Sequence, residues 1–208
     1  MKRVIVYCEG PTEETFLNRL LGPYLADKGV YLFASCCNGV ARYAAIHRDL
    51  ISLCRSDTTA TITTMLDFYG IPGDTPGYHE SDENSFYQVA ERIERKIEED
   101  IDAQNFHAFL MVHEFEALLF TEPDCFSYCM EAQSVRSLNL VRKQFPNPEA
   151  IDHGQSTAPS KRILKVYPAY SKIVDGYNIA TLIGIDKMRD SCPHFNQWVS
   201  WMENLQKD

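Results

Sequence analysis

Short runs of β-branched and aromatic residues alternate with helical stretches over the first half of this sequence. The runs cover residues 2–8, 30–36, 60–68 and 106–112, and their length and composition are typical of buried strands. Between them, apolar residues recur at spacings of three and four, which indicates helices. This alternation predicts an α/β fold with a mostly parallel sheet.

The second part of the chain has helical patterns alone. Helices are expected near residues 124–130, 133–144, 160–166, 179–183 and 194–205. We therefore divide the 208 residues into an α/β core over 1–120 and a helical C-terminal extension over 121–208. At this length the extension is expected to pack on the core in one compact unit.

Charge and cysteine content exclude several classes of protein. The net charge of −9 disfavours non-specific binding to nucleic acid, although residues 134–172 hold seven basic and only two acidic side chains. No apolar run approaches the roughly 18 residues that cross a bilayer, and the N-terminal apolar stretch is too short for a signal peptide. Seven cysteines without a CxxC pair favour reduced thiols. We expect a cytoplasmic protein with no membrane partner.

Acidic residues follow three of the four expected strands. Glu9 ends the first strand, Asp67 ends the third, and Glu114 and Glu116 follow the fourth. Because the carboxyl ends of parallel strands meet at one edge of a sheet, these side chains are expected to converge. Unpaired carboxylates are costly to bury, and hard oxygen ligands favour Mg²⁺ or Mn²⁺. The alternative is that each acid caps the helix that follows it.

The stretch EGPTEE, residues 9–14, adds backbone features that a ligand could use. Gly10 allows the backbone to approach a ligand closely. Thr12 is the expected N-cap of the next helix, whose N-terminus offers an anion site. Neither a P-loop nor a dinucleotide-binding glycine fingerprint is present in the sequence. Gly10 and Thr12 are therefore candidate substrate-binding residues.

Five sequence blocks stand out together: EGPTEE, LDFYG, HEFEALLF, PSKR and CPHFNQWV. In combination they resemble domain-of-unknown-function family 4276 of bacterial proteins. That family is similar to Toprim domains, the metal-binding folds of topoisomerases, primases and overcoming-lysogenization-defect (OLD) nucleases. The resemblance implies a Toprim-like, Rossmann-type sheet in which Glu9 matches the Toprim glutamate and Asp67 the first aspartate of a DxD pair. Tyr69 stands in place of the second aspartate.

The HEFE stretch could replace the missing aspartate. Glu114 and Glu116 are two residues apart, so on an extended segment both would face one way, whereas in a helix they would diverge. His113 is expected to be buried or to support a ligand rather than to bind metal itself. Tyr69 could stack on a base or pack under the loop that follows it.

The basic segment supplies the remaining candidates. OLD-like nucleases are similar in pairing a Toprim metal site with a lysine, and the resemblance places that lysine at Lys161. Such a cation would offset the charge of a phosphoryl transition state, with Arg162 as a second source. The alternative is a helix start capped by Ser160 and flanked by solvated bases.

Two functions follow from these residues. The first is a metal-dependent phosphodiesterase or nuclease with Glu9, Asp67 and Lys161 as catalytic residues. Family members resemble parts of phage-defence systems and often lie beside AAA-type ATPases, which implies a nucleic-acid substrate and an ATPase partner. The second is a non-catalytic Toprim-like adaptor, whose acids hold structure and whose helical part docks a partner. Tyr69 and the overall acidity favour the adaptor, and the convergence of polar blocks favours the enzyme.

Overall fold

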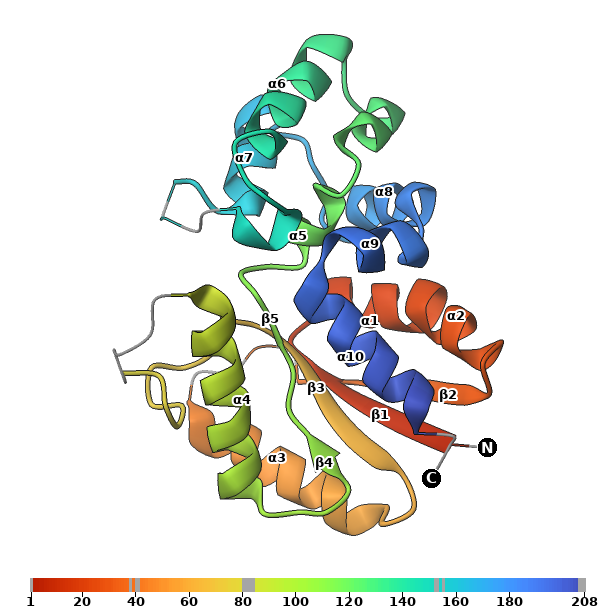
Figure 1. The fold of residues 1–208 in the computed structure, drawn as a ribbon, viewed down its shortest axis with the longest axis vertical. Coiled ribbons are helices and arrows are strands. Elements are labelled where there is room, and N and C mark those ends of the chain that lie inside the picture. Colours follow the sequence, from red (N-terminus) through yellow and green to blue (C-terminus); the bar gives the residue numbers. More distant parts are fainter. Residues whose placement is uncertain are drawn as a thin grey trace. The chain divides into compact units, whose positions relative to one another are not determined.

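Figure 1 shows the computed structural model of the chain, which describes residues 2–37, 39, 42–79, 85–151, 154 and 156–205. The chain forms two compact units. The first comprises Met1–Met111 and Ser200–Asp208, and the second comprises Val112–Val199. In the described part of the chain, no helix is both long enough and apolar enough to cross a membrane.

The first unit contains a parallel sheet with strand order β2-β1-β3-β4. The strand β5 also pairs with β3, at residues nearer the carboxyl end of β3 than those that pair with β4. Its strands are β1 (Lys2–Cys8), β2 (Val30–Cys36), β3 (Thr61–Asp67), β4 (Phe106–His107) and β5 (Leu110–Met111). All of the pairings are parallel. The expected α/β class with a mostly parallel sheet is confirmed.

The last expected strand, over 106–112, is split into β4 and β5. The buried Thr64 hydroxyl donates to the Phe109 carbonyl at 2.7 Å and accepts from the Phe109 amide at 2.8 Å. The Thr64 side chain of β3 therefore replaces the backbone hydrogen bonds that would pair β3 with a continuous strand at this point. The Ala108 amide turns instead to the Glu98 carboxylate, at 3.0 Å. A continuous strand was the wrong expectation because side chains here compete with the backbone.

Helices cover both faces of the sheet (Figure 1). They are α1 (Pro11–Phe16), a π-helical turn (Leu17–Leu21), α2 (Gly22–Ala26), α3 (Tyr43–Ser56) and α4 (Phe86–Ile101). The π turn precedes Pro23, which lacks an amide hydrogen for regular helical bonding. Gly22 is required there, since a Cβ atom would lie 2.8 Å from the Leu17 carbonyl oxygen.

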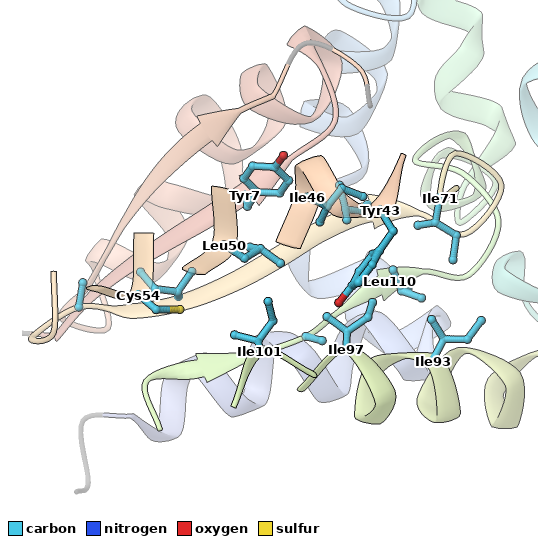
Figure 2. Packing of buried hydrophobic residues seen from close by; sticks show 14 residues of the cluster. Tyr7, Tyr43, Ile46, Leu50, Cys54, Ile71, Ile93, Ile97, Ile101 and Leu110 are labelled. Carbon is cyan, nitrogen blue, oxygen red and sulfur yellow. The ribbon is translucent and has the colours of Figure 1, made fainter. Parts of the chain in front are cut away.

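The core shown in Figure 2 lies between the sheet, α3 and α4. Ile93, Ile97 and Ile101 project from one side of α4 toward α3, as their four-residue spacing predicts. Leu50 of α3 is fully buried among them. This packing anchors the helices that follow β2 and β3, and so fixes the ends of those strands.

The second unit is helical. It contains α5 (Glu116–Leu119), 3-10 helices at Pro123–Tyr128 and Pro148–Ala150, α6 (Ala132–Arg142), α7 (Pro159–Val166), α8 (Val174–Ile183), α9 (Ile185–Ser191) and the start of α10 (Pro193–Asn204). Gly184, at φ 80°, separates α8 from α9. The helix expected at 179–183 begins five residues earlier, at Val174, even though Gly176 lies within it. A glycine weakens a helix by only about 1 kcal/mol, and packing readily overrides that.

Candidate functional site

Glu9 and Asp67 lie at the carboxyl ends of neighbouring strands in the first unit. Glu9 follows the last residue of β1, and Asp67 is the last residue of β3, which runs parallel to β1. The register pairs Cys8 with Met65, so Glu9 and Asp67 are one residue out of step along the edge. Both side chains are partly buried.

The Glu9 carboxylate lies against the turn that Asp67 begins. The Gly70 amide donates to the Asp67 carbonyl at 2.8 Å and closes this turn. A Cβ atom on Gly70 would fall 2.3 Å from Glu9 Oε2 and 3.1 Å from Oε1. The absence of a side chain at Gly70 therefore makes the space that the Glu9 carboxylate occupies beside this turn.

The backbone of Glu9 is held from the other side by the segment after β2. The Cys37 thiol donates to the Glu9 carbonyl at 3.5 Å, and the Cys36 thiol does so at 3.8 Å. The Gly39 amide donates to the same oxygen at 3.1 Å. These contacts fix where the Glu9 side chain starts, without using its carboxylate.

The helix after Glu9 begins earlier than the sequence indicated. Gly10, not Thr12, is the N-cap of α1, because Pro11 suits the first helical position. The Gly10 amide donates to Glu13 Oε2 at 3.0 Å, and Glu13 is only 7 % exposed. The Glu13 carboxylate therefore already lies at the start of this helix. The expected role of Gly10 and Thr12 in binding substrate stays a prediction.

Tyr69 lies two residues beyond Asp67 and is 38 % exposed. Its ring makes an edge contact with Phe68, at 5.7 Å between ring centroids. Phe68 in turn stacks on Tyr78 at 6.4 Å. Tyr69 is thus supported on one side while much of its surface stays open to solvent.

The remaining candidates belong to the second unit, where Glu114 caps a helix distant in sequence. Its Oε2 accepts from the Ser160 amide at 2.9 Å, and its Oε1 accepts from the Ser160 hydroxyl at 3.0 Å. Ser160 is the second residue of α7, and Ala158 is the N-cap. The alternative that Ser160 caps this helix was therefore wrong, because Glu114 supplies the acceptor and its charge suits the helix N-terminus.

Glu116 binds a different partner and is 1 % exposed. Its carboxylate pairs with Lys172 Nζ at 3.1 Å, and that lysine is 45 % exposed. Burial raises the pKa of Glu116 above its ordinary value, Lys172 acts against the rise, and the Glu114 charge adds to it. The two glutamates are therefore held by separate donors.

Tyr170 places a buried hydroxyl in the same region. In the part of the chain that the structure describes, this hydroxyl has no hydrogen-bond partner. Burial, followed by the Glu116 and Asp175 charges, raises the pKa of Tyr170 far above its ordinary value. A Cβ atom on Gly176 would lie 2.9 Å from this hydroxyl, which explains the glycine inside α8.

His113 is buried, at 1 % exposure, and its backbone is left-handed with φ 89°. A positive φ is uncommon for a residue other than glycine and marks a position fixed by its surroundings. Lys161 is exposed on α7. Arg162 is partly buried, and its Nε donates to the Thr157 carbonyl at 2.6 Å.

The predicted residues thus fall into two sets. Glu9, Gly10, Thr12, Asp67 and Tyr69 belong to the first unit, and His113, Glu114, Glu116, Ser160, Lys161 and Arg162 belong to the second. The sequence did not predict a role for Gly70, Tyr170 or Lys172. A lysine in the basic segment was visible, but no spacing rule pairs it with a carboxylate 56 residues away.

Carboxylates such as Glu9 and Asp67 suit a magnesium-like ion better than zinc. Among the described residues, no three His, Cys, Asp or Glu side chains are placed to hold a metal ion together. Mg²⁺ is commonly held by one or two carboxylates, with water and substrate phosphates completing its coordination. Glu9 and Asp67 are two carboxylates at neighbouring strand ends, one residue out of register, and the Glu9 carboxylate occupies the space beside Gly70.

The chain matches the model of a protein family over most of its length. The model of the family described as "Domain of unknown function (DUF4276)" matches residues 8–203. No protein with a curated description matches the chain, and no solved structure does.

Proposed function

The chain belongs to the DUF4276 family, and we propose that it is a metal-dependent phosphodiesterase of the nuclease type, acting on nucleic acid. In this proposal the first unit is Toprim-like, and Glu9 and Asp67 hold Mg²⁺ or Mn²⁺. The proposal extends to a role as the cytoplasmic effector of a phage-defence system with an AAA-type ATPase. That last part rests on the family resemblance.

One observation carries the proposal. The Glu9 carboxylate occupies space beside the Asp67 turn that any side chain at Gly70 would fill. Gly70 is exposed and Glu9 is partly buried, so this carboxylate lies near the surface of the first unit. Two carboxylates on adjacent strand ends are the ligands that a hard divalent cation prefers.

The side chains around this edge have distinct proposed roles. A divalent ion bound there would neutralise phosphate oxygens and lower the pKa of a coordinated water. Glu9 and Asp67 would orient that ion, and the exposed Tyr69 ring would stack on a nucleobase. Lys161 belongs to the second unit, and the role proposed for it from the family resemblance, to offset the charge that develops on a phosphate, is a separate proposal.

Glu114 and Glu116 were also expected to bind metal, and this stays a prediction. Their carboxylates accept hydrogen bonds from Ser160 and Lys172. A metal ion would have to replace or share those donors.

A single-turnover cleavage assay tests the proposed activity. Labelled single-stranded DNA and RNA are incubated with Mn²⁺ and the native protein, with and without its co-purified ATPase. We expect Glu9→Gln and Asp67→Asn to abolish cleavage. Glu91→Gln, a change at an exposed position of α4, is the control and should cleave normally. Cleavage that persists in both site variants would contradict the assignment.

The second candidate function is a non-catalytic adaptor. Tyr69 in place of a second aspartate favours it, as do the hydrogen bonds that engage Glu114 and Glu116 within the protein. Under this alternative the native protein cleaves nothing, even with the ATPase present. Glu9→Gln and Asp67→Asn would then leave ATPase binding unchanged.

A further inference from the structure

A cavity of about 560 Å³ lies between α6 and α7 of the second unit. Leu138 and Val141 of α6 and Val166 of α7 form apolar parts of its wall. Arg162 and Lys165 of α7 line it as well. The volume lies within the range of about 300–1,000 Å³ that is usual for small-molecule sites.

The cavity carries positive charge without a matching acid. Its described lining includes two basic side chains and no carboxylate. Ser137, Ser156 and Thr157 add hydroxyl groups to the same lining. Two cations around one space are donors for an anion, and neither cation shares that space with a neutralising acid. The Ser137 hydroxyl already donates to the Gln133 carbonyl at 3.0 Å.

Arg162 is held in a fixed orientation. Its Nε donates to the Thr157 carbonyl at 2.6 Å, and its guanidinium carbon lies 5.5 Å from the centre of the Phe145 ring. Within the described residues, its two terminal nitrogens have no recorded hydrogen-bond partner. A guanidinium fixed in this way loses little freedom when it binds a phosphate through those nitrogens.

We propose that this cavity binds a nucleotide, with the phosphate at Arg162 and Lys165 and the nucleoside against the apolar wall. The ligand class follows from the charge, the apolar wall and the volume of the cavity. The proposed function is used only to favour a nucleotide over other phosphate esters. The nucleotide is either free or part of a nucleic-acid strand. The two sources present the same phosphate ester, so the test must separate them.

Calorimetric titration in EDTA tests the proposal without any metal-dependent step. The probes are AMP, adenosine and a single-stranded DNA of ten thymidines. We expect native protein to bind AMP or the oligonucleotide, and adenosine roughly tenfold or more weakly, because a charged hydrogen bond to phosphate is lost. Binding of AMP alone identifies a free nucleotide as the ligand, and binding of the oligonucleotide alone identifies a strand.

Two variants and one control locate the site. Lys165→Glu changes an exposed side chain and should weaken binding of the bound probe by roughly tenfold or more. Arg162→Gln should act in the same direction. Lys143→Glu makes the same charge change at an exposed lysine outside the cavity, and its effect should stay within about twofold, as solvated surface charges contribute little.

Two results would overturn the inference. One is no binding of AMP or of the oligonucleotide at millimolar concentration. The other is equal weakening by Lys165→Glu and Lys143→Glu. Both are independent of the cleavage assay, because a protein that never cleaves can still bind a nucleotide in EDTA, and a metal-dependent nuclease can leave this cavity empty.

Discussion

Replacing Gly70 with alanine would put a methyl carbon where the Glu9 carboxylate now lies. The new Cβ would be 2.3 Å from Glu9 Oε2, whereas ordinary contact begins at 3.4 Å. The carboxylate must therefore move by about 1 Å, which far exceeds the tolerance of roughly 0.2 Å for metal–ligand distances. We expect Gly70→Ala to weaken Mn²⁺ binding roughly 10–100-fold, the usual effect of disturbing the support of a ligand.

The fold should tolerate the same substitution. The atom displaced is the end of a flexible side chain, and Gly70 has no left-handed φ that alanine would resist. A compatible glycine-to-alanine change shifts the free energy of unfolding by only about 0.4–1 kcal/mol, in the stabilising direction. We therefore expect urea denaturation to show a change smaller than about 1 kcal/mol.

Gly73→Ala is the matched control in the same loop. Its Cβ would lie 3.9 Å from the nearest atom, a His79 nitrogen, so nothing needs to move. Isothermal titration with Mn²⁺ should give native affinity for Gly73→Ala. Equal affinity in Gly70→Ala and Gly73→Ala would refute the idea that Glu9 is a metal ligand.

Three further changes test other parts of the molecule. The buried Glu116 has a raised pKa, so its contribution to stability is greatest below the ordinary glutamate pKa and falls as pH rises through the folded-state value. As the pH rises from 4 to 7, the free energy of unfolding of Glu116→Gln should therefore increase relative to that of the native protein. Urea denaturation that gives the same difference between the two proteins at both pH values would contradict this. Gly176→Ala should destabilise by about 1–3 kcal/mol through overpacking against the Tyr170 hydroxyl, and Tyr170→Phe in the same chain should recover most of that loss in thermal denaturation. Lys161→Ala should leave the melting temperature unchanged because the lysine is exposed, yet slow single-turnover cleavage roughly 100-fold; equal rates would make Lys161 a surface base.

The sheet and most helices could be predicted because their signals are local. The four-residue spacing along α4 and the β-branched runs of β1 and β3 depend on nearby residues alone. The split between β4 and β5 could not be predicted, since it depends on the Thr64 hydroxyl reaching Phe109, 45 residues away. Hydrophobic patterns carry no information about such a contact.

The candidate site divides in the same way. The positions of Glu9 and Asp67 at the ends of β1 and β3 could be predicted because parallel strands bring their carboxyl ends to one edge, a rule that needs only the strand order. The partners of Glu114 and Glu116 were not found. Ser160 and Lys172 lie 46 and 56 residues further along the chain, and only the packing of α7 and the segment before α8 determines which carboxylate each one meets.

Direct measurement of Mn²⁺ binding is the most direct test of the central claim, that Glu9 and Asp67 form a divalent-cation site. Isothermal titration should show binding to the native protein and to Glu91→Gln. The same titration should show that binding is lost in Glu9→Gln and in Asp67→Asn, while both variants keep native circular dichroism. Native affinity in both of these folded variants would contradict the account.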